Sequence, residues 1–236
     1  MLKILIFIFS LSTISAQYNI VLSRNIHNSI LGIKNTLLQK PGRTILITGA
    51  LGAVFTHQFD KDTQKWFINN QPLPKSINKF GDNYGNLHSG IIVLGSTAVH
   101  SYISKKSIFF EYAFSTLAVN GLTTVLIKEL AMRERPNNAD HRSFPSGHVS
   151  HSFTVASIFK EIYGWKAGAP AYTLAVITAM NRLQDNKHYL SDVVFGASLG
   201  TAFGTSFAKL YFDSNKISIK YSLINNKVYF VYLLDT

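Results

Sequence analysis

Three separated stretches of the sequence carry side chains suited to binding and transferring a phosphoryl group. The first, residues 128–136, holds two cations, Lys128 and Arg135, seven positions apart. Seven helical residues fall roughly 20° short of two full turns, so both cations would share one face and reach the same anion. Pro136 disfavours helical geometry at Arg135, which predicts that the helix ends there. Taken alone, this stretch is more typical of a solvated basic helix end that complements the helix dipole.

The second stretch, residues 143–148, predicts an anion site at the start of a helix. Ser146 suits the N-cap position, and Gly147 lets the backbone come close to a ligand. Free backbone N–H groups at a helix start bind phosphate. His148 would lie in the first turn beside that site, where a general acid can protonate a leaving oxygen. A capped helix with a surface histidine would have the same sequence.

The third stretch, residues 181–192, pairs an imidazole with a carboxylate. His188 and Asp192 are four positions apart and would meet on one helix face. A carboxylate on one imidazole nitrogen fixes the tautomer and makes the other nitrogen a nucleophile or base. Arg182 lies off that face on a continuous helix, but the polar residues 184–186 predict a break that returns Arg182 to the same site. The alternative is an ordinary His–Asp pair at a helix start.

The elements that must position these side chains are mostly helical. Helical spacing of apolar residues predicts helices over residues 26–38, 44–55, 91–103, 109–133, 148–163, 170–183 and 189–211. Residues 58–87 are rich in Asn, Lys and Pro, which predicts loops and short turns. Alternating apolar residues over 217–223 and 228–234 flank Asn225-Asn226, which is a hairpin pattern. We therefore expect an all-α fold, a helical bundle of about six helices, with a small C-terminal β-hairpin.

The amino terminus has the layout of a secretory signal peptide. Lys3 precedes an apolar run over residues 4–9, and small residues follow up to Ala16. The run is far shorter than the ~20 residues that span a bilayer, so cleavage after Ala16 is favoured over an uncleaved anchor. The predicted organisation is a signal peptide over residues 1–16, a helical domain over 17–212 and a hairpin tail over 213–236.

Composition limits the classes of function. The chain has 236 residues, a net charge of +11 and 15% charged residues against 47% hydrophobic ones, so disorder is not expected. With no cysteine, disulfides, thiolate metal sites and cysteine nucleophiles are excluded. Positive charge indicates anionic partners, and an export signal argues against nucleic acid among them.

Two segments bear on membrane association. Residues 109–127 include Glu111 and Asn120, and residues 193–212 carry glycines that let helices approach closely in membranes or in soluble bundles. A spanning helix needs ~18 or more apolar residues with few charges. We therefore favour a soluble or surface-bound protein over a membrane-spanning one.

Taken together, the order and spacing of the three stretches resemble the type 2 phosphatidic acid phosphatase superfamily. This group includes lipid phosphatases, bacterial class A acid phosphatases and vanadium-dependent haloperoxidases. Its pattern is K-x6-RP, then PSGH, then SR-x5-H-x3-D. The matching residues here are Lys128 with Arg135-Pro136, Pro145-Ser146-Gly147-His148, and Asn181-Arg182 with His188 and Asp192. Asn181 stands where the family usually has serine.

The resemblance implies the helical bundle of that family and a metal-independent phosphatase without a cofactor. His188 would attack phosphorus and form a phosphohistidine, and Asp192 would orient His188. His148 would protonate the leaving oxygen and then activate water. The groups implied to hold the phosphate oxygens are Lys128, Arg135, Arg182, the Ser146 hydroxyl and the Gly147 N–H. Phosphoryl transfer depends on positioning and charge neutralisation, which three cations can supply.

Four alternatives remain open. They are a soluble periplasmic non-specific acid phosphatase, a vanadate-binding haloperoxidase, a catalytically silent envelope binding protein and a metallophosphatase. The last would use His141, His148 and His151, but Asp140 is their nearest carboxylate, and carboxylates dominate magnesium sites. We expect a phosphorylated lipid or small phosphoester as substrate, at the membrane surface or in the periplasm or cell envelope. Neither the substrate nor the oligomeric state is specified by the sequence.

Overall fold

The computed structural model describes residues 25–213, 217–222 and 227–232. The expected signal peptide, residues 1–16, lies outside these residues. A first helix covers residues 25–38. The further helices are α2 (Gly42–His57), α3 (Asp60–Asn70), α4 (Lys75–Asn83), α5 (Ser89–Ser104), α6 (Ile108–Ala131), α7 (Gly147–Tyr163), α8 (Trp165–Gln184) and α9 (Leu190–Ala208), with the π-helical turns η1 (Tyr84–His88) and η2 (Lys209–Asp213).

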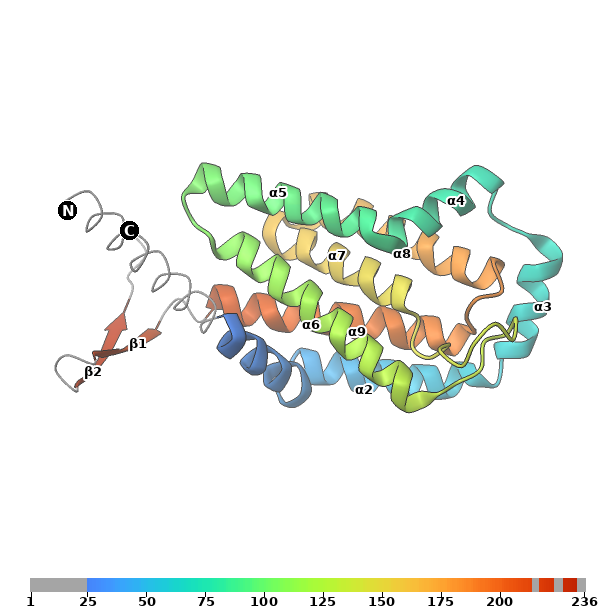
Figure 1. The fold of residues 1–236 in the computed structure, drawn as a ribbon, viewed down its shortest axis with the longest axis horizontal. Coiled ribbons are helices and arrows are strands. Elements are labelled where there is room, and N and C mark those ends of the chain that lie inside the picture. The colour runs from blue at the N-terminus through green and yellow to red at the C-terminus, as the bar shows by residue number, and fades with distance from the viewer. Residues whose placement is uncertain (1–24, 214–216, 223–226, 233–236) are drawn as a thin grey trace, which may run out of the picture.

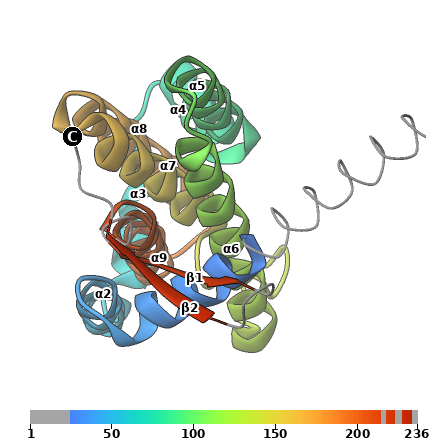
Figure 2. The ribbon, with the colours of Figure 1, turned by 90° about the vertical axis from the view of Figure 1, so that its left-hand side faces the viewer.

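Helix α9 is the central element of the bundle. It packs between α2 and α7, as the view along the bundle in Figure 2 shows. Glycines on α9 make this contact close. A Cβ atom on Gly196 would lie 2.8 Å from the Ser146 carbonyl oxygen, and one on Gly200 would lie 2.8 Å from the Thr154 nitrogen. The regularly spaced glycines of α9 therefore form the surface against which α7 packs.

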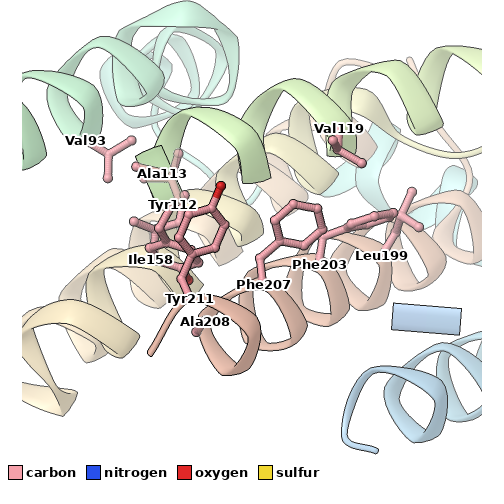
Figure 3. Close-up of a cluster of buried hydrophobic side chains, with 11 residues drawn as sticks. Val93, Tyr112, Ala113, Val119, Ile158, Leu199, Phe203, Phe207, Ala208 and Tyr211 are labelled. Carbon is pink, nitrogen blue, oxygen red and sulfur yellow. The ribbon is translucent and has the colours of Figure 1, made fainter. Parts of the chain in front are cut away.

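The main apolar core lies where α5, α6, α7 and α9 meet (Figure 3). Tyr112, Ile158, Phe203 and Phe207 are almost completely buried in it. The Tyr112 hydroxyl donates a hydrogen bond to the Gly204 carbonyl at 2.8 Å, which satisfies the buried phenol. This core fixes α6, α7 and α9, which carry Lys128, His148 and Asp192 of the predicted site.

The expectation of loops over residues 58–87 is wrong. These residues form α3, α4 and η1. Helix α3 has acidic residues in its first turn, which suits the helix dipole, and α4 starts directly after Pro74. Gly81 lies against Ile177 of α8, so tertiary contact stabilises a helix whose polar composition gives little apolar periodicity.

Two helix boundaries also differ from expectation. Helix α8 begins at Trp165 rather than at Pro170, and the proline lies inside its second turn. Helix α6 ends at Ala131, because Met132 adopts a positive φ of 45°. The chain therefore leaves the helix four residues before Arg135, and Pro136 is not the residue that stops it.

At the carboxyl end, β1 (Ile217–Ser222) pairs antiparallel with β2 (Lys227–Tyr232), with Ile217 opposite Tyr232. The turn expected at Asn225-Asn226 lies outside the described residues and stays a prediction.

By length and composition alone, two helices in the described part of the chain are apolar enough to cross a membrane. They are Ile108–Ala131 and Leu190–Phe212, and they contain the two segments considered in the sequence. The second is the central helix of the bundle, and core helices of soluble proteins pass the same test. The loop between α6 and α7, the loop between α8 and α9, and α3 gather at one end of the bundle, on the right in Figure 1.

Candidate active site

A cavity of about 630 Å³ opens at this end of the bundle. Six of the eight predicted site residues line it. These are Lys128, Arg135, Gly147, His148, Arg182 and His188. The other two, Ser146 and Asp192, are completely buried next to lining residues. Residues from α6, α7, α8 and the connecting loops thus converge on one space.

The two cations of the first stretch reach the cavity by different routes. Lys128 extends from the last turn of α6, whereas Arg135 lies in the loop, so they do not share a helix face as expected. The Lys128 ammonium donates to the Arg142 carbonyl at 2.6 Å. Arg135 donates from Nε to Asp140 Oδ1 at 2.7 Å, and its Nη1 lies 3.2 Å from His188 Nε2.

The contact with Arg135 defines the tautomer of His188. A guanidinium only donates, so Nε2 accepts and carries a lone pair, and the ring proton is assigned to Nδ1. Nδ1 lies 3.6 Å from Asp192 Oδ2. His188 is buried, and burial lowers its pKa to about 4 although Asp192 raises it. The imidazole is therefore neutral at pH 7, and the Nε2 lone pair, which accepts from Arg135 here, could attack phosphorus once Arg135 turned to an oxygen of a bound phosphate.

The pair is formed differently from the expected single helix face. His188 precedes α9, whose N-cap is Tyr189, and Asp192 is the third residue of the helix. Asp192 Oδ2 accepts from the Tyr189 N–H at 2.9 Å, so the carboxylate caps the helix as well as facing His188.

The start of α7 presents a serine hydroxyl without a partner. Ser146 is the N-cap in extended geometry, yet its side chain makes no capping hydrogen bond. Its Oγ is buried and has no hydrogen-bond partner within the described part of the chain. The Ser146 N–H donates to the Asp192 carbonyl at 3.1 Å, which ties the start of α7 to α9. A hydroxyl held in this way is available to an added ligand.

His148 lies opposite a carboxylate that was not anticipated. Its Nε2 is 3.8 Å from Asp82 Oδ1, at the end of α4. Burial and the charge of Arg182 lower the pKa of His148 to about 3, and Asp82 acts in the opposite direction. His148 is thus neutral at pH 7. A bound phosphate dianion would add further negative charge beside it and favour its protonated form.

Arg182 is 2% exposed and reaches the cavity from the last turn of α8. It pairs with Asp82, and its Nε donates to Asn181 Oδ1 at 2.7 Å. Asn181 also donates to the Asn78 carbonyl at 2.9 Å. The asparagine that replaces the usual serine therefore orients Arg182 and joins α8 to α4.

Sequence reasoning missed several residues that surround these side chains. Asp82 and Lys187 line the cavity, and Arg133 and Ser143 contact Asp192. Arg133 lies inside the first motif stretch and Ser143 inside the second, and this position was the available signal that they belong to the site. Asp82 lies in the segment that was expected to be loop, and nothing in its local sequence indicates a site. Among the described residues, no group of three or more His, Cys, Asp or Glu side chains is placed to hold a metal ion.

The comparisons with known proteins agree with this geometry. A family model described as the PAP2 superfamily matches residues 108–216, which include all eight predicted site residues. The matched stretch, 109 of the 236 residues, is similar to the PAP2 superfamily. The crystal structure of Aquifex aeolicus LpxE superposes with a TM-score of 0.53 and 19% sequence identity, covering 64% of this chain and 95% of that one. The helical bundle therefore shares the fold of that protein.

Two curated relatives carry related names. The lipid A 1-phosphatase of Porphyromonas gingivalis is 36% identical over 75 residues, which are 30% of this chain and 17% of the relative. The lipid A 4'-phosphatase of Helicobacter pylori is 29% identical over 119 residues, which are 50% of this chain and 57% of the relative. The matches thus span less than two thirds of either relative.

Proposed function

We propose that this chain is a phosphatase that removes phosphate from a lipid headgroup through a phosphohistidine, without a metal ion. The observation that carries the proposal is the pairing of His188 Nε2, which bears a lone pair toward the cavity, with the Arg135 guanidinium 3.2 Å away. The proposed nucleophile thus lies next to a cation that would bind the phosphate oxygens.

In the first half-reaction, His188 Nε2 attacks phosphorus and the bond from phosphorus to the ester oxygen breaks. His148, once protonated, donates its proton to the departing oxygen. Asp192 faces Nδ1–H of His188 and stabilises the positive charge that the ring acquires.

In the second half-reaction, neutral His148 takes a proton from water, and the resulting hydroxide attacks phosphorus. The bond between phosphorus and Nε2 breaks and phosphate leaves. Lys128, Arg135 and Arg182 line the cavity and supply the positive charge that this reaction needs. The cavity lining also contains two carboxylates. Asp140 pairs with Arg135, and Asp82 pairs with Arg182.

Two observations favour a lipid as substrate over a soluble ester. Both curated relatives are named as lipid A phosphatases, so a phosphorylated glycolipid is the substrate class to test first. In addition, α2, α5 and α6 expose large apolar side chains, among them Leu51 (66%), Ile91 (67%), Leu122 (73%) and Leu130 (75%). Exposed apolar surface of this extent fits contact with a membrane, beside which the cavity would meet lipid headgroups.

The test is phosphate release by the purified chain in detergent with EDTA present. A phosphorylated glycolipid is compared with an aryl phosphate, and His188→Ala is compared with His27→Ala, an exposed histidine of the first helix. We expect turnover in EDTA, preference for the glycolipid, and a loss of at least a thousandfold in His188→Ala only. Requirement for a divalent ion, or substantial turnover by His188→Ala, would overturn the mechanism. Preference for the aryl ester would instead indicate a non-specific acid phosphatase.

The covalent step has its own signature. In His148→Ala, an aryl phosphate still reacts because its phenolate leaves without protonation, but water is no longer activated. The phosphoenzyme should therefore accumulate, giving a burst of phenol equal to the amount of enzyme. Absence of a burst together with normal steady turnover would exclude His148 from the second step.

A further inference from the structure

We infer that Arg133, held by Asp60, is a positioning residue that aligns Asp192 with His188. The inference rests on the proposed function, in which His188 is the nucleophile. Neither Arg133 nor Asp60 lines the cavity, so each would act through another side chain rather than on the substrate.

The donors around Asp192 divide between its two oxygens. Oδ1 accepts from Arg133 Nη1 at 2.6 Å. Oδ2 accepts from the Ser143 hydroxyl at 2.5 Å and from the Tyr189 N–H at 2.9 Å, and it is the oxygen that faces His188. Because Asp192 is 0% exposed, water does not replace a lost partner. Arg133 therefore fixes which oxygen remains for the nucleophile.

Arg133 is itself held in place from two other directions. Its Nη2 donates to Asp60 Oδ2 at 2.7 Å, and Asp60 is only 3% exposed. Its guanidinium carbon lies 4.4 Å from the centre of the Tyr189 ring. Planar contacts of this kind, with a carboxylate on each side and a ring face beneath, suit a guanidinium and not an ammonium.

Asp60 completes the arrangement by binding the same helix end that carries Asp192. Its Oδ1 accepts from the Ser191 N–H at 2.9 Å, and its Oδ2 accepts from the Ser191 hydroxyl at 2.7 Å. A residue of α3 thus positions both the start of α9 and the arginine that holds Asp192. If Arg133 served stability alone, its loss would weaken the fold without selectively affecting the reaction at phosphorus.

The experiment separates these two roles by comparing two inorganic probes. Phosphate occupies the cation-lined cavity in its ground-state shape, whereas vanadate resembles the five-coordinate transition state and needs an aligned nucleophile. For wild type, Arg133→Gln and Asp60→Asn, we would measure kcat and KM on the phosphorylated glycolipid and the calorimetric affinities for phosphate and for vanadate. Arg43→Gln is the matched control, because Arg43 is exposed on α2.

In both variants we expect kcat to fall roughly 10- to 100-fold, as when an outer partner of a functional ligand is removed. Vanadate affinity should fall in parallel, while KM and phosphate affinity stay within about twofold. The double variant should lose little more than Arg133→Gln, because both residues act through Asp192. Arg133→Lys should remain impaired, and it replaces Arg133→Gln if that variant fails to fold.

Unchanged kcat and vanadate affinity in both variants would overturn the inference, and so would equal losses of phosphate and vanadate affinity. If the wild-type chain binds both probes but releases no phosphate from any ester, the proposed function fails. The vanadate comparison then still decides whether Arg133 and Asp60 position the site.

Discussion

At the scale of single residues, Asp82 controls the electrostatics of the cavity as much as its cations do. Its carboxylate lies 3.8 Å from His148 Nε2 and 3.8 Å from the Lys187 ammonium, and it pairs with Arg182. Burial raises the pKa of Asp82, but Arg182, Lys187 and His148 together outweigh burial and lower that pKa overall. The cavity lining therefore contains a negative charge of its own, the Asp82 carboxylate, beside its cations.

Asp82→Asn should shift the pH dependence of catalysis. The groups that face His148 are Asp82, Arg182, His188 and Lys187, and of these only Asp82 raises its pKa. In the substrate complex, His148 donates a proton only below its pKa, so kcat falls as pH rises, and loss of Asp82 should move this decline to lower pH. The measurement is kcat between pH 3 and 8, with Asp62→Asn, an exposed residue of α3, as control. An unshifted or raised limb would contradict the assignment of His148 as the acid.

At the scale of elements, the site depends on how closely α7 approaches α9. A Cβ on Gly200 would collide with the Ser150 carbonyl oxygen and approach the Thr154 nitrogen, both of them backbone atoms of α7. Backbone cannot move aside as a flexible side chain can. Because α7 also carries Ser146, Gly147 and His148, any separation of the two helices changes the cavity.

Gly200→Ala should therefore destabilise the chain by roughly 1–3 kcal/mol, as overpacking does, and reduce activity. Gly121→Ala on α6 is the matched control, because a Cβ there has no atom within 4 Å. That control should gain ~0.5–1 kcal/mol from helix propensity. Both free energies of unfolding follow from denaturation in detergent. Equal effects of the two substitutions would show that the glycine contact is unimportant.

The helices that carry the motifs were predictable because their apolar periodicity and motif spacing are local properties. The meeting of Lys128, His148, Arg182 and His188 followed from the family resemblance rather than from periodicity. Helices α3 and α4 were not predictable, because their stability comes from contact with α8 and the start of α9. Asp60 was missed for the same reason, since its partner Arg133 lies 73 residues away along the chain.

At the scale of the whole molecule, substitutions on the apolar surface of α6 can test whether this surface faces water or the hydrocarbon of a bilayer. Leu122 and Leu126 are 73% and 59% exposed. In water, a change from leucine to lysine at such positions usually alters stability by less than ~0.5 kcal/mol. Facing the hydrocarbon of a bilayer, each lysine costs about 2.5–3.5 kcal/mol on insertion scales.

Leu122→Lys combined with Leu126→Lys should thus sharply lower the amount of chain recovered in the membrane fraction. The wild type should remain there after an alkaline wash and be released only by detergent. Lys105→Leu, the reverse exchange in the turn between α5 and α6, serves as a control. Full recovery of the double variant in the membrane fraction would show that this face of α6 does not contact lipid.

The network around Asp192 has a consequence for biosynthesis. Asp60 is synthesised 131 residues before its partner Ser191, and Arg133 is synthesised 59 residues before Asp192. Until the start of α9 leaves the ribosome, the nascent chain holds these charges without their final partners, and the nucleophile does not yet exist. Under the proposed mechanism, a chain that stops before Asp192 lacks the carboxylate that faces His188, so activity should begin only once the start of α9 has been made.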